Sequence, residues 1–176
     1  MTDKPAIRAR TRGARLAFAS AGPIRVAPEF VERLRAEMVV ASYRPMPGEA
    51  DPSPLERAAT VAGCALALPF LTDRSSPMHF RRWIGALVVG PYGIEQPPTD
   101  VPALAPDVIL TPLVAFDRTG ARLGQGAGYY DRAFAAHPSA WRVGVAWSVQ
   151  EVDVLPTDAW DIPLHAIATE KEWITP

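Results

Sequence analysis

Short apolar runs alternate along this chain with longer amphipathic stretches. Five mainly apolar runs predict β-strands: Met38–Tyr43, Ala65–Leu68 ended by Pro69, Met78–Trp83, Val108–Leu113 and Arg142–Ala146. Helical spacing of apolar positions predicts four helices: Asp3–Ala19, Pro28–Arg35, Leu55–Gly63 and Tyr129–Ala136. Strands and helices that alternate in this way favour an α/β fold, with a sheet covered by helices on both faces.

The composition indicates one globular domain. The chain has 176 residues, of which 48% are hydrophobic and 21% charged, enough to bury a core of its own. Proline is frequent between the elements, but no stretch is long or biased enough to separate domains. The segment Gly90–Pro106 holds five prolines and is predicted to be an ordered loop with little backbone freedom. We expect a single domain over residues 1–176.

The net charge of −1 gives the chain no overall attraction to nucleic acid or membrane, so we expect a small-molecule substrate. Cys64 is the only cysteine, which excludes an intrachain disulfide; its apolar neighbours predict a small core residue rather than a catalytic thiol. No apolar run approaches the length of a membrane span or a secretion signal. We expect a cytoplasmic protein that is a monomer or a weak homo-oligomer.

The most informative segment is glycine-rich and follows the apolar run Val108–Phe116. Gly124, Gly126 and Gly128 stand just before the predicted helix Tyr129–Ala136. Glycines in such a turn allow positive φ and a close approach of backbone N–H groups to an anion, and the helix dipole adds to the attraction. The segment matches neither the dinucleotide fingerprint nor the P-loop pattern, and glycine-rich turns between strand and helix are common. The glycines alone leave a phosphate site and a plain turn both open.

The residues beside this loop favour the phosphate site. Arg122 and Arg132 offer guanidinium donors, and Asp131 offers a hard oxygen ligand for Mg²⁺. Tyr129 and Tyr130 have rings that can stack on a planar group.

Three charged positions elsewhere have a functional and an ordinary interpretation. Lys4 and Arg8 are four residues apart on one side of the first predicted helix, where they could converge on a polyphosphate or form a solvated face. Glu49 lies in a proline-rich loop past the strand Met38–Tyr43, which is where α/β proteins bind ligands, but an exposed turn acid would look the same.

Other chemistries find little support. The three histidines have no metal-ligand spacing with one another or with Cys64, and no GxSxG elbow is present. The tryptophans are expected to act mostly as packing anchors: Trp83, Trp141, Trp147, Trp160 and Trp173.

Taken together, these residues resemble the 5-formyltetrahydrofolate cyclo-ligase family, also called methenyltetrahydrofolate synthetases. The resemblance covers nearly the whole chain in order, through these segments: Lys4 and Arg8, Tyr43–Asp51, Leu68–Pro69, Met78 and Phe80, Gly93–Ile94 and Pro97, Thr111–Asp117, Gly120, Arg122–Gly124, Gly126, Gly128–Arg132, Gln150–Pro156, Trp160–Asp161 and Thr169–Glu170. Three features depart from the pattern. Ala127 replaces a glycine, Gln96 stands where an acid is expected and Glu95 precedes it, and Met46–Pro54 is rich in proline. Alanine at 127 is tolerable if its φ is negative and strained if its φ is positive.

The resemblance implies a three-layer α/β sandwich with a mostly parallel central sheet, like that of sugar-phosphate isomerases and coenzyme A transferases. It implies ATP-dependent conversion of 5-formyltetrahydrofolate to 5,10-methenyltetrahydrofolate, with ATP as a substrate and Mg²⁺ as cofactor. The implied catalytic residues are Arg122, Tyr129 and Asp131, and the implied metal ligands are Asp131 and Asp161. Asp161 has an ordinary reading as a turn residue before Pro163. The implied ATP site is Lys4, Arg8, Arg122, Leu123, Gly124, Gln125, Gly126, Ala127, Gly128, Tyr129 and Tyr130. The implied folate site is Glu49, Gln125, Gly126, Ala127, Gly128 and Tyr129.

Two other classes stay open at this point. One is a sugar-phosphate isomerase or acyl-transferase relative on a similar fold, which needs no ATP and places a catalytic acid at a strand end. The other is a folate- or nucleotide-binding relative that has lost turnover.

Overall fold

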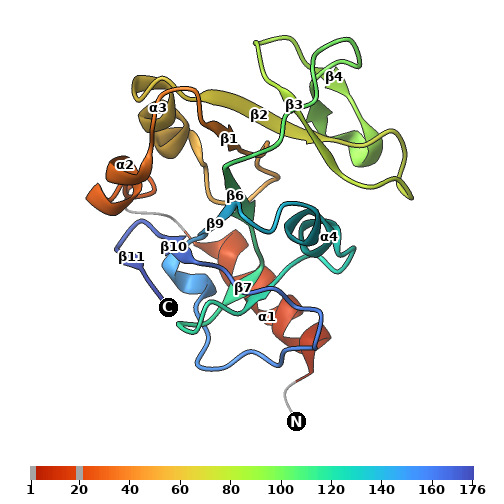
Figure 1. The fold of residues 1–176 in the computed structure, drawn as a ribbon. Coiled ribbons are helices and arrows are strands. Elements are labelled where there is room, and N and C mark those ends of the chain that lie inside the picture. Colours follow the sequence, from red (N-terminus) through yellow and green to blue (C-terminus); the bar gives the residue numbers. More distant parts are fainter. Residues whose placement is uncertain (1–2, 19–21) are drawn as a thin grey trace.

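The computed structural model describes residues 3–18 and 22–176. A seven-stranded sheet with the order β11-β10-β9-β6-β1-β2-β3 forms the centre of the fold (Figure 1). Five of its strands are parallel: β1 (Val39–Ala41), β2 (Ala65–Phe70), β6 (Val108–Pro112), β9 (Trp141–Val145) and β10 (Ala166–Ala168). The edge strands β3 (His79–Arg82) and β11 (Trp173–Ile174) run antiparallel to their neighbours.

Helices cover both faces of this sheet. The helices α2 (Pro28–Arg33) and α3 (Ser53–Val61) contribute to one hydrophobic core, and α4 (Tyr129–Ala136) contributes to the other. Successive strand residues alternate between the two cores, as Val40 and Ala41 do in β1, because side chains along a strand point to opposite faces. Figure 1 shows α4 on the opposite side of β6 and β9 from α2 and α3. The predicted three-layer α/β fold is confirmed.

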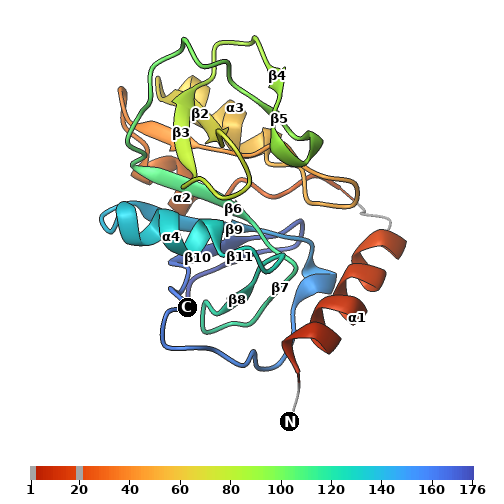
Figure 2. The same ribbon diagram turned by 90° about the vertical axis from the view of Figure 1, so that its right-hand side faces the viewer.

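The helix α1 (Lys4–Ala17) lies outside these layers, beside the hairpin of β7 (Ala115–Phe116) and β8 (Arg122–Leu123) (Figure 2). Its buried Ile7 packs against both strands of this hairpin in a third, smaller core. The helix has a proline in its first turn, as is common, and ends where Phe18 takes up an extended backbone. Ala19, the predicted last residue, lies outside the described residues. The packing turns one face of α1 towards the glycine-rich loop that follows β8.

Two predictions about local structure are wrong. The strand β2 continues through Pro69, because its pairing with β1 ends at Ala67 and a proline is tolerated where one side of a strand has no partner. The segment Gly90–Pro106 is not only loop: its β5 (Glu95–Gln96) pairs with β4 (Val88–Val89), and the 3-10 turn Pro91–Gly93 connects them. A second 3-10 turn, Ser148–Gln150, lies near α1.

Cys64 is half-buried beside the core that includes α3, and its Sγ donates to the carbonyl of Arg35 at 3.3 Å. Burial raises the pKa of the thiol, so the thiolate needed for nucleophilic attack is disfavoured.

No helix within the described part of the chain is long and apolar enough to cross a membrane.

Candidate active site

A cavity of about 1110 Å³ lies at the carboxyl ends of β1, β2 and β6. Its walls come from α1, the glycine-rich loop, the start of α4, the turn before β5 and the segment 158–162. Parallel sheets commonly bind ligands at this edge. Every residue predicted for the site lines this one cavity: Lys4, Arg8, Glu49, Arg122, Leu123, Gly124, Gln125, Gly126, Ala127, Gly128, Tyr129, Tyr130, Asp131 and Asp161.

The glycine-rich loop has the backbone that its sequence predicted. Gly126 and Gly128 have φ angles of 109° and 69°, which disfavour any side chain. A Cβ on Gly126 would lie 3.8 Å from the guanidinium of Arg8, so the loop passes directly beside that cation. Gly128 immediately precedes α4, whose first N–H groups therefore start at the loop.

Ala127 is not among the residues with positive φ in the described chain. The strained alternative for this alanine is therefore wrong, and the departure from the family pattern leaves the loop conformation intact.

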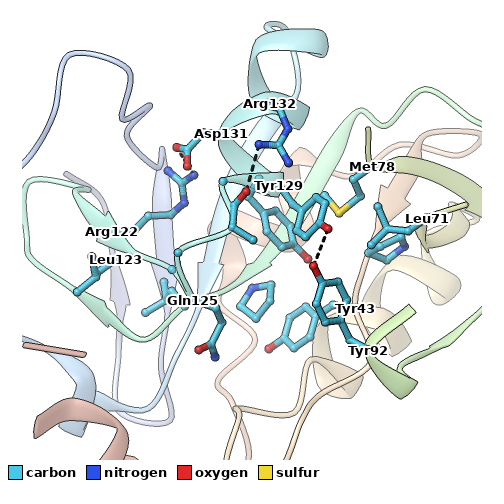
Figure 3. A pocket seen from close by; sticks show the side chains of 18 of the residues that line it. Tyr43, Leu71, Met78, Tyr92, Arg122, Leu123, Gln125, Tyr129, Asp131 and Arg132 are labelled. Atoms are coloured by element: carbon cyan, nitrogen blue, oxygen red, sulfur yellow. Dashed lines mark hydrogen bonds and ion pairs between the residues drawn. The ribbon is translucent and has the colours of Figure 1, made fainter. Parts of the chain in front are cut away.

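Arg122 is fixed between the loop and α4. Its Nη2 lies 2.6 Å from Oδ1 of Asp131, its Nη1 donates to the carbonyl of Ile162, and its guanidinium stacks 4.5 Å from the ring centre of Phe134. Figure 3 shows Arg122 and Asp131 facing each other at one end of the cavity, while Tyr43 and Tyr92 lie at the other end. A guanidinium held in this way is preorganised for an anion at the loop.

Lys4 joins the same end of the cavity through two carboxylates. Its Nζ lies 2.6 Å from Oδ2 of Asp158 and 2.8 Å from Oδ2 of Asp161. Burial opposes the charge of Lys4, but the hydrogen bonds to both aspartates outweigh it and raise the pKa of the amine. Burial likewise opposes the charge of Asp161, yet the bond from Lys4 lowers the pKa of this carboxyl below its usual range. Both groups are therefore charged at neutral pH.

The carboxylates at this end could hold a hard cation only if a bound ligand supplied further oxygens. Among the described residues, no group of three or more histidine, cysteine, aspartate or glutamate side chains could hold a metal ion. Asp131 and Asp161 are both linked to Arg122, the first by an ion pair and the second by its electrostatic field. Mg²⁺ needs no more than one or two protein carboxylates when phosphate and water oxygens complete its shell, so the donor set suits it.

Glu49 is buried, so its reading as an exposed turn acid is wrong. Its side chain is 5% exposed; Oε2 accepts from the Met46 amide at 3.0 Å, and Oε1 accepts from Nε2 of Gln125 at 3.4 Å. Nη1 of Arg15 lies 3.6 Å from Oε1. Burial raises the pKa of Glu49, while the Met46 amide and the charge of Arg15 lower it. A carboxylate of this kind suits a ligand that presents N–H donors.

The paired tyrosines occupy different depths. Tyr129 lies near the mouth, where its hydroxyl donates to the carbonyl of Arg74 at 2.5 Å and lies 3.0 Å from the hydroxyl of Tyr92. The bond with Tyr92 raises the pKa of Tyr129. Tyr130 packs edge-on against Phe134, and burial raises the pKa of its hydroxyl well above the ordinary value. Both phenols are therefore neutral at neutral pH, and the single hydroxyl hydrogen of Tyr129 is already donated to Arg74.

Gln96 has a structural role. Its Nε2 donates to the carbonyl of Leu71 at 3.0 Å, and its Oε1 accepts from the Leu71 amide at 3.1 Å. An ionised carboxylate could not make the first bond. The acid at Glu95 instead lies 3.7 Å from Nε of Arg44 and lines the cavity.

Several residues at this site were not predicted from the sequence. Trp160 lines the cavity and is 71% exposed, so its assignment as a packing anchor is wrong. Tyr92 has a φ of 64°, which nothing in its sequence indicated. Arg12 donates to Oε1 of Gln125, and Arg15 reaches Glu49. These arginines continue the helical spacing of Lys4 and Arg8, and extending that row would have found them.

Comparison with known proteins agrees with this geometry. Residues 1–170 match the model of the 5-formyltetrahydrofolate cyclo-ligase family. The 5-formyltetrahydrofolate cyclo-ligase of Escherichia coli K12 is 39% identical over 144 residues, which cover 76% of this chain and 79% of that protein. The cyclo-ligase of Mycolicibacterium smegmatis is 38% identical over 95 residues, covering 51% and 49%.

Solved structures extend the comparison. The solution structure of Aquifex aeolicus 5,10-methenyltetrahydrofolate synthetase superposes with a TM-score of 0.76 at 32% identity, over 98% of this chain and 92% of that one. A 5,10-methenyltetrahydrofolate synthetase from Mycoplasma pneumoniae shares the fold, with a TM-score of 0.69 at 22% identity over 94% and 98%. With a matching family model over nearly its whole length and relatives of this similarity, the chain belongs to the 5-formyltetrahydrofolate cyclo-ligase family.

Proposed function

We propose that this cavity binds ATP and 5-formyltetrahydrofolate together and converts them to 5,10-methenyltetrahydrofolate, ADP and phosphate. The observation that supports this most is the convergence in one cavity of a glycine loop flanked by fixed cations and a buried carboxylate, Glu49. The loop and cations form an anion-binding end, and Glu49 lies in a second region suited to a heterocycle with N–H donors.

The chemistry requires activation of the formyl group. An amide oxygen is a poor leaving group, so N10 of the folate cannot displace it directly at a useful rate. In the first step the formyl oxygen attacks the γ-phosphorus, and ADP leaves. In the second step N10 attacks the formyl carbon and loses its proton, and the oxygen departs with the phosphate. Such transfers depend on positioning and charge neutralisation more than on a protein nucleophile.

The residues at the anion-binding end account for that neutralisation. Arg8 and Arg122 lie beside the loop, and Lys4 lies between two carboxylates on the same wall. Asp131 and Asp161 would hold Mg²⁺, which when bound neutralises charge on phosphate oxygens. Lys4 and Arg122 would then exchange their carboxylate partners for phosphate. The N–H groups of Gly124–Gly128 and of the first turn of α4 would complete the contacts.

The remaining residues serve the folate. Glu49 and Gln125, joined at 3.4 Å, would contact the pterin or formyl end. Tyr129 at the cavity mouth would present its neutral hydroxyl and its ring face to the bound substrates.

An assay of the purified protein tests this proposal against its rivals. A cyclo-ligase releases phosphate only when ATP and 5-formyltetrahydrofolate are both present, and methenyl absorbance rises in step. Turnover of any substrate without ATP would favour an isomerase or acyl transferase. Binding of both ligands without phosphate release would favour a relative that has lost turnover.

A further inference from the structure

A row of basic residues on α1 faces the cavity and its surroundings. Lys4 bonds to Asp161, Arg8 donates through Nε to the carbonyl of Gly124 at 2.8 Å, and Arg12 donates to Gln125. Arg15 continues the row in the last turn of the helix. The four residues are three or four positions apart, and this spacing brings their side chains onto one face. The row thus runs from the anion-binding end to Glu49.

The surroundings of Arg15 set it apart from its neighbours. Its side chain is 6% exposed, and its Nη1 lies 3.6 Å from Oε1 of Glu49 and donates to the carbonyl of Leu113 at 3.4 Å. Within the described chain, its buried Nε has no hydrogen-bond partner. A guanidinium this deeply buried is costly unless a partner carboxylate stays ionised. The positive charge of Arg15 is therefore compensated by the carboxylate of Glu49 and not by solvent.

The turn that carries Glu49 packs closely against the end of α1. Gly48 has a φ of 80°, and a Cβ built on it would lie 3.0 Å from Cδ2 of Leu16 and 3.7 Å from Nε of Arg15. The amide of Met46 holds Oε2 of Glu49, while Arg15 approaches Oε1. Different groups thus contact the two oxygens, and these contacts fix the orientation of the carboxylate relative to the cavity.

We propose that Arg15 is a positioning residue for folate recognition, which acts by keeping the buried Glu49 ionised and oriented towards the substrate. The inference rests on the proposed role of Glu49 in binding the folate. Without Arg15, a carboxyl in this environment takes up a proton more readily, and a hydrogen-bond acceptor becomes in part a donor. Arg15 itself is not required to touch either substrate.

The alternative is that Arg15 only anchors the end of α1 to the body of the protein. An anchor would affect ATP and folate affinity alike, because the same helix carries Lys4 and Arg8. A positioning residue affects the folate selectively, and its effect disappears once Glu49 has lost its charge.

The test is a double-mutant cycle of Arg15→Met and Glu49→Gln, with Arg15→Lys as the conservative variant and the exposed Arg10→Met as control. Calorimetry measures the Kd of 5-formyltetrahydrofolate and of a non-hydrolysable ATP analogue, and thermal unfolding verifies that each variant is folded. Arg15→Met should weaken folate binding about tenfold or more, equivalent to about 1.4 kcal/mol, with little change for the nucleotide. Arg15→Lys should restore part of the loss, and Arg10→Met should match the wild type.

The cycle and the pH dependence decide the matter. If Arg15 acts through Glu49, Arg15→Met adds little folate loss to Glu49→Gln, so the two effects are not additive. Folate affinity of Arg15→Met should recover as the pH rises, because Glu49 then loses its proton without help from the arginine. Among the described residues, the other titratable groups that interact with Glu49 are Tyr43 and Tyr130, and both stay neutral. Equal loss of both ligands, or additive effects, would overturn the proposal. An unaffected Glu49→Gln would refute the role of Glu49 in folate binding, and with it the proposal for Arg15. A wild-type protein that binds no folate would refute the proposed function itself.

Discussion

Nη2 of Arg122 and Oδ1 of Asp131 are 2.6 Å apart, so the cation expected at the phosphates and the carboxylate expected at the metal are held as one pair. The neighbouring Lys4 and Asp161 repeat this arrangement at 2.8 Å. Each pair keeps its charges ordered and compensated before ligands arrive. Binding of a metal nucleotide would then exchange partners rather than create new charges, which limits the reorganisation needed for catalysis.

Asp131→Asn tests the metal assignment. We expect turnover to fall about a hundredfold, as for the loss of one group that stabilises transition-state charge, and the Mg²⁺ requirement to rise. Phosphate release measured over a Mg²⁺ titration gives both values, with the exposed Asp153→Asn as control. Normal turnover and normal Mg²⁺ dependence in Asp131→Asn would show that Asp131 is not a ligand.

Lys4→Ala separates a phosphate contact from a packing role. Losing a charged hydrogen-bond donor should raise the KM for ATP by about ten- to a hundredfold, with a much smaller change for the folate. Steady-state kinetics with each substrate varied in turn gives the comparison, and Lys171→Ala on the exposed C-terminal segment should behave as wild type. An equal loss for both substrates would indicate that Lys4 supports the fold.

The Lys4–Asp161 pair should also leave a pH signature in stability. The lowered pKa of Asp161 means that its contribution is present above the unfolded pKa and lost as the pH falls through the folded value. The raised pKa of Lys4 means that its contribution is present below the unfolded pKa and lost as the pH rises through the folded value. The difference in unfolding free energy between wild type and Lys4→Ala should therefore be largest at neutral pH. Denaturant unfolding across the pH range measures it, and a difference independent of pH would contradict the charge pair.

Alanine should be favoured at position 127 of the glycine-rich loop, and glycine at position 128. Ala127→Gly should leave turnover nearly unchanged and destabilise the protein by about 0.4–1 kcal/mol, because the backbone there suits alanine and glycine only loosens the unfolded chain. Gly128→Ala should cost about 1–2 kcal/mol, since its φ is 69° and the new Cβ would meet Arg132 Nη1 at 3.2 Å. Unfolding and kinetic measurements on both variants decide this. A large gain in both turnover and stability from Ala127→Gly would mean that the alanine impairs the loop.

Gln96→Glu tests whether Gln96 is structural. The new carboxylate cannot donate to the carbonyl of Leu71, so we expect a loss of about 1–3 kcal/mol in unfolding free energy. Turnover at a temperature where the variant is folded should change little. Higher activity with unchanged stability would instead indicate that an acid at this position takes part in the reaction.

The layer arrangement and the anion-binding end could be predicted from the sequence, because both depend on local patterns of residues. Strand and helix periodicity located the central elements, and the glycines with positive φ lay where the loop was expected. Burial of Glu49 and exposure of Trp160 depend on how distant loops approach each other, which no local pattern records. The pairing of Lys4 with Asp161 joins residues 157 positions apart, so spacing could place each of them but not their contact.

The most direct test follows the formyl oxygen. With 5-formyltetrahydrofolate labelled with oxygen-18 in the formyl group, a single turnover with unlabelled ATP should deliver the label into the released inorganic phosphate, as mass spectrometry of the phosphate would show. The proposed phosphorylation of the formyl oxygen requires this transfer. Methenyltetrahydrofolate formed alongside unlabelled phosphate, with the oxygen-18 released to water, would contradict it.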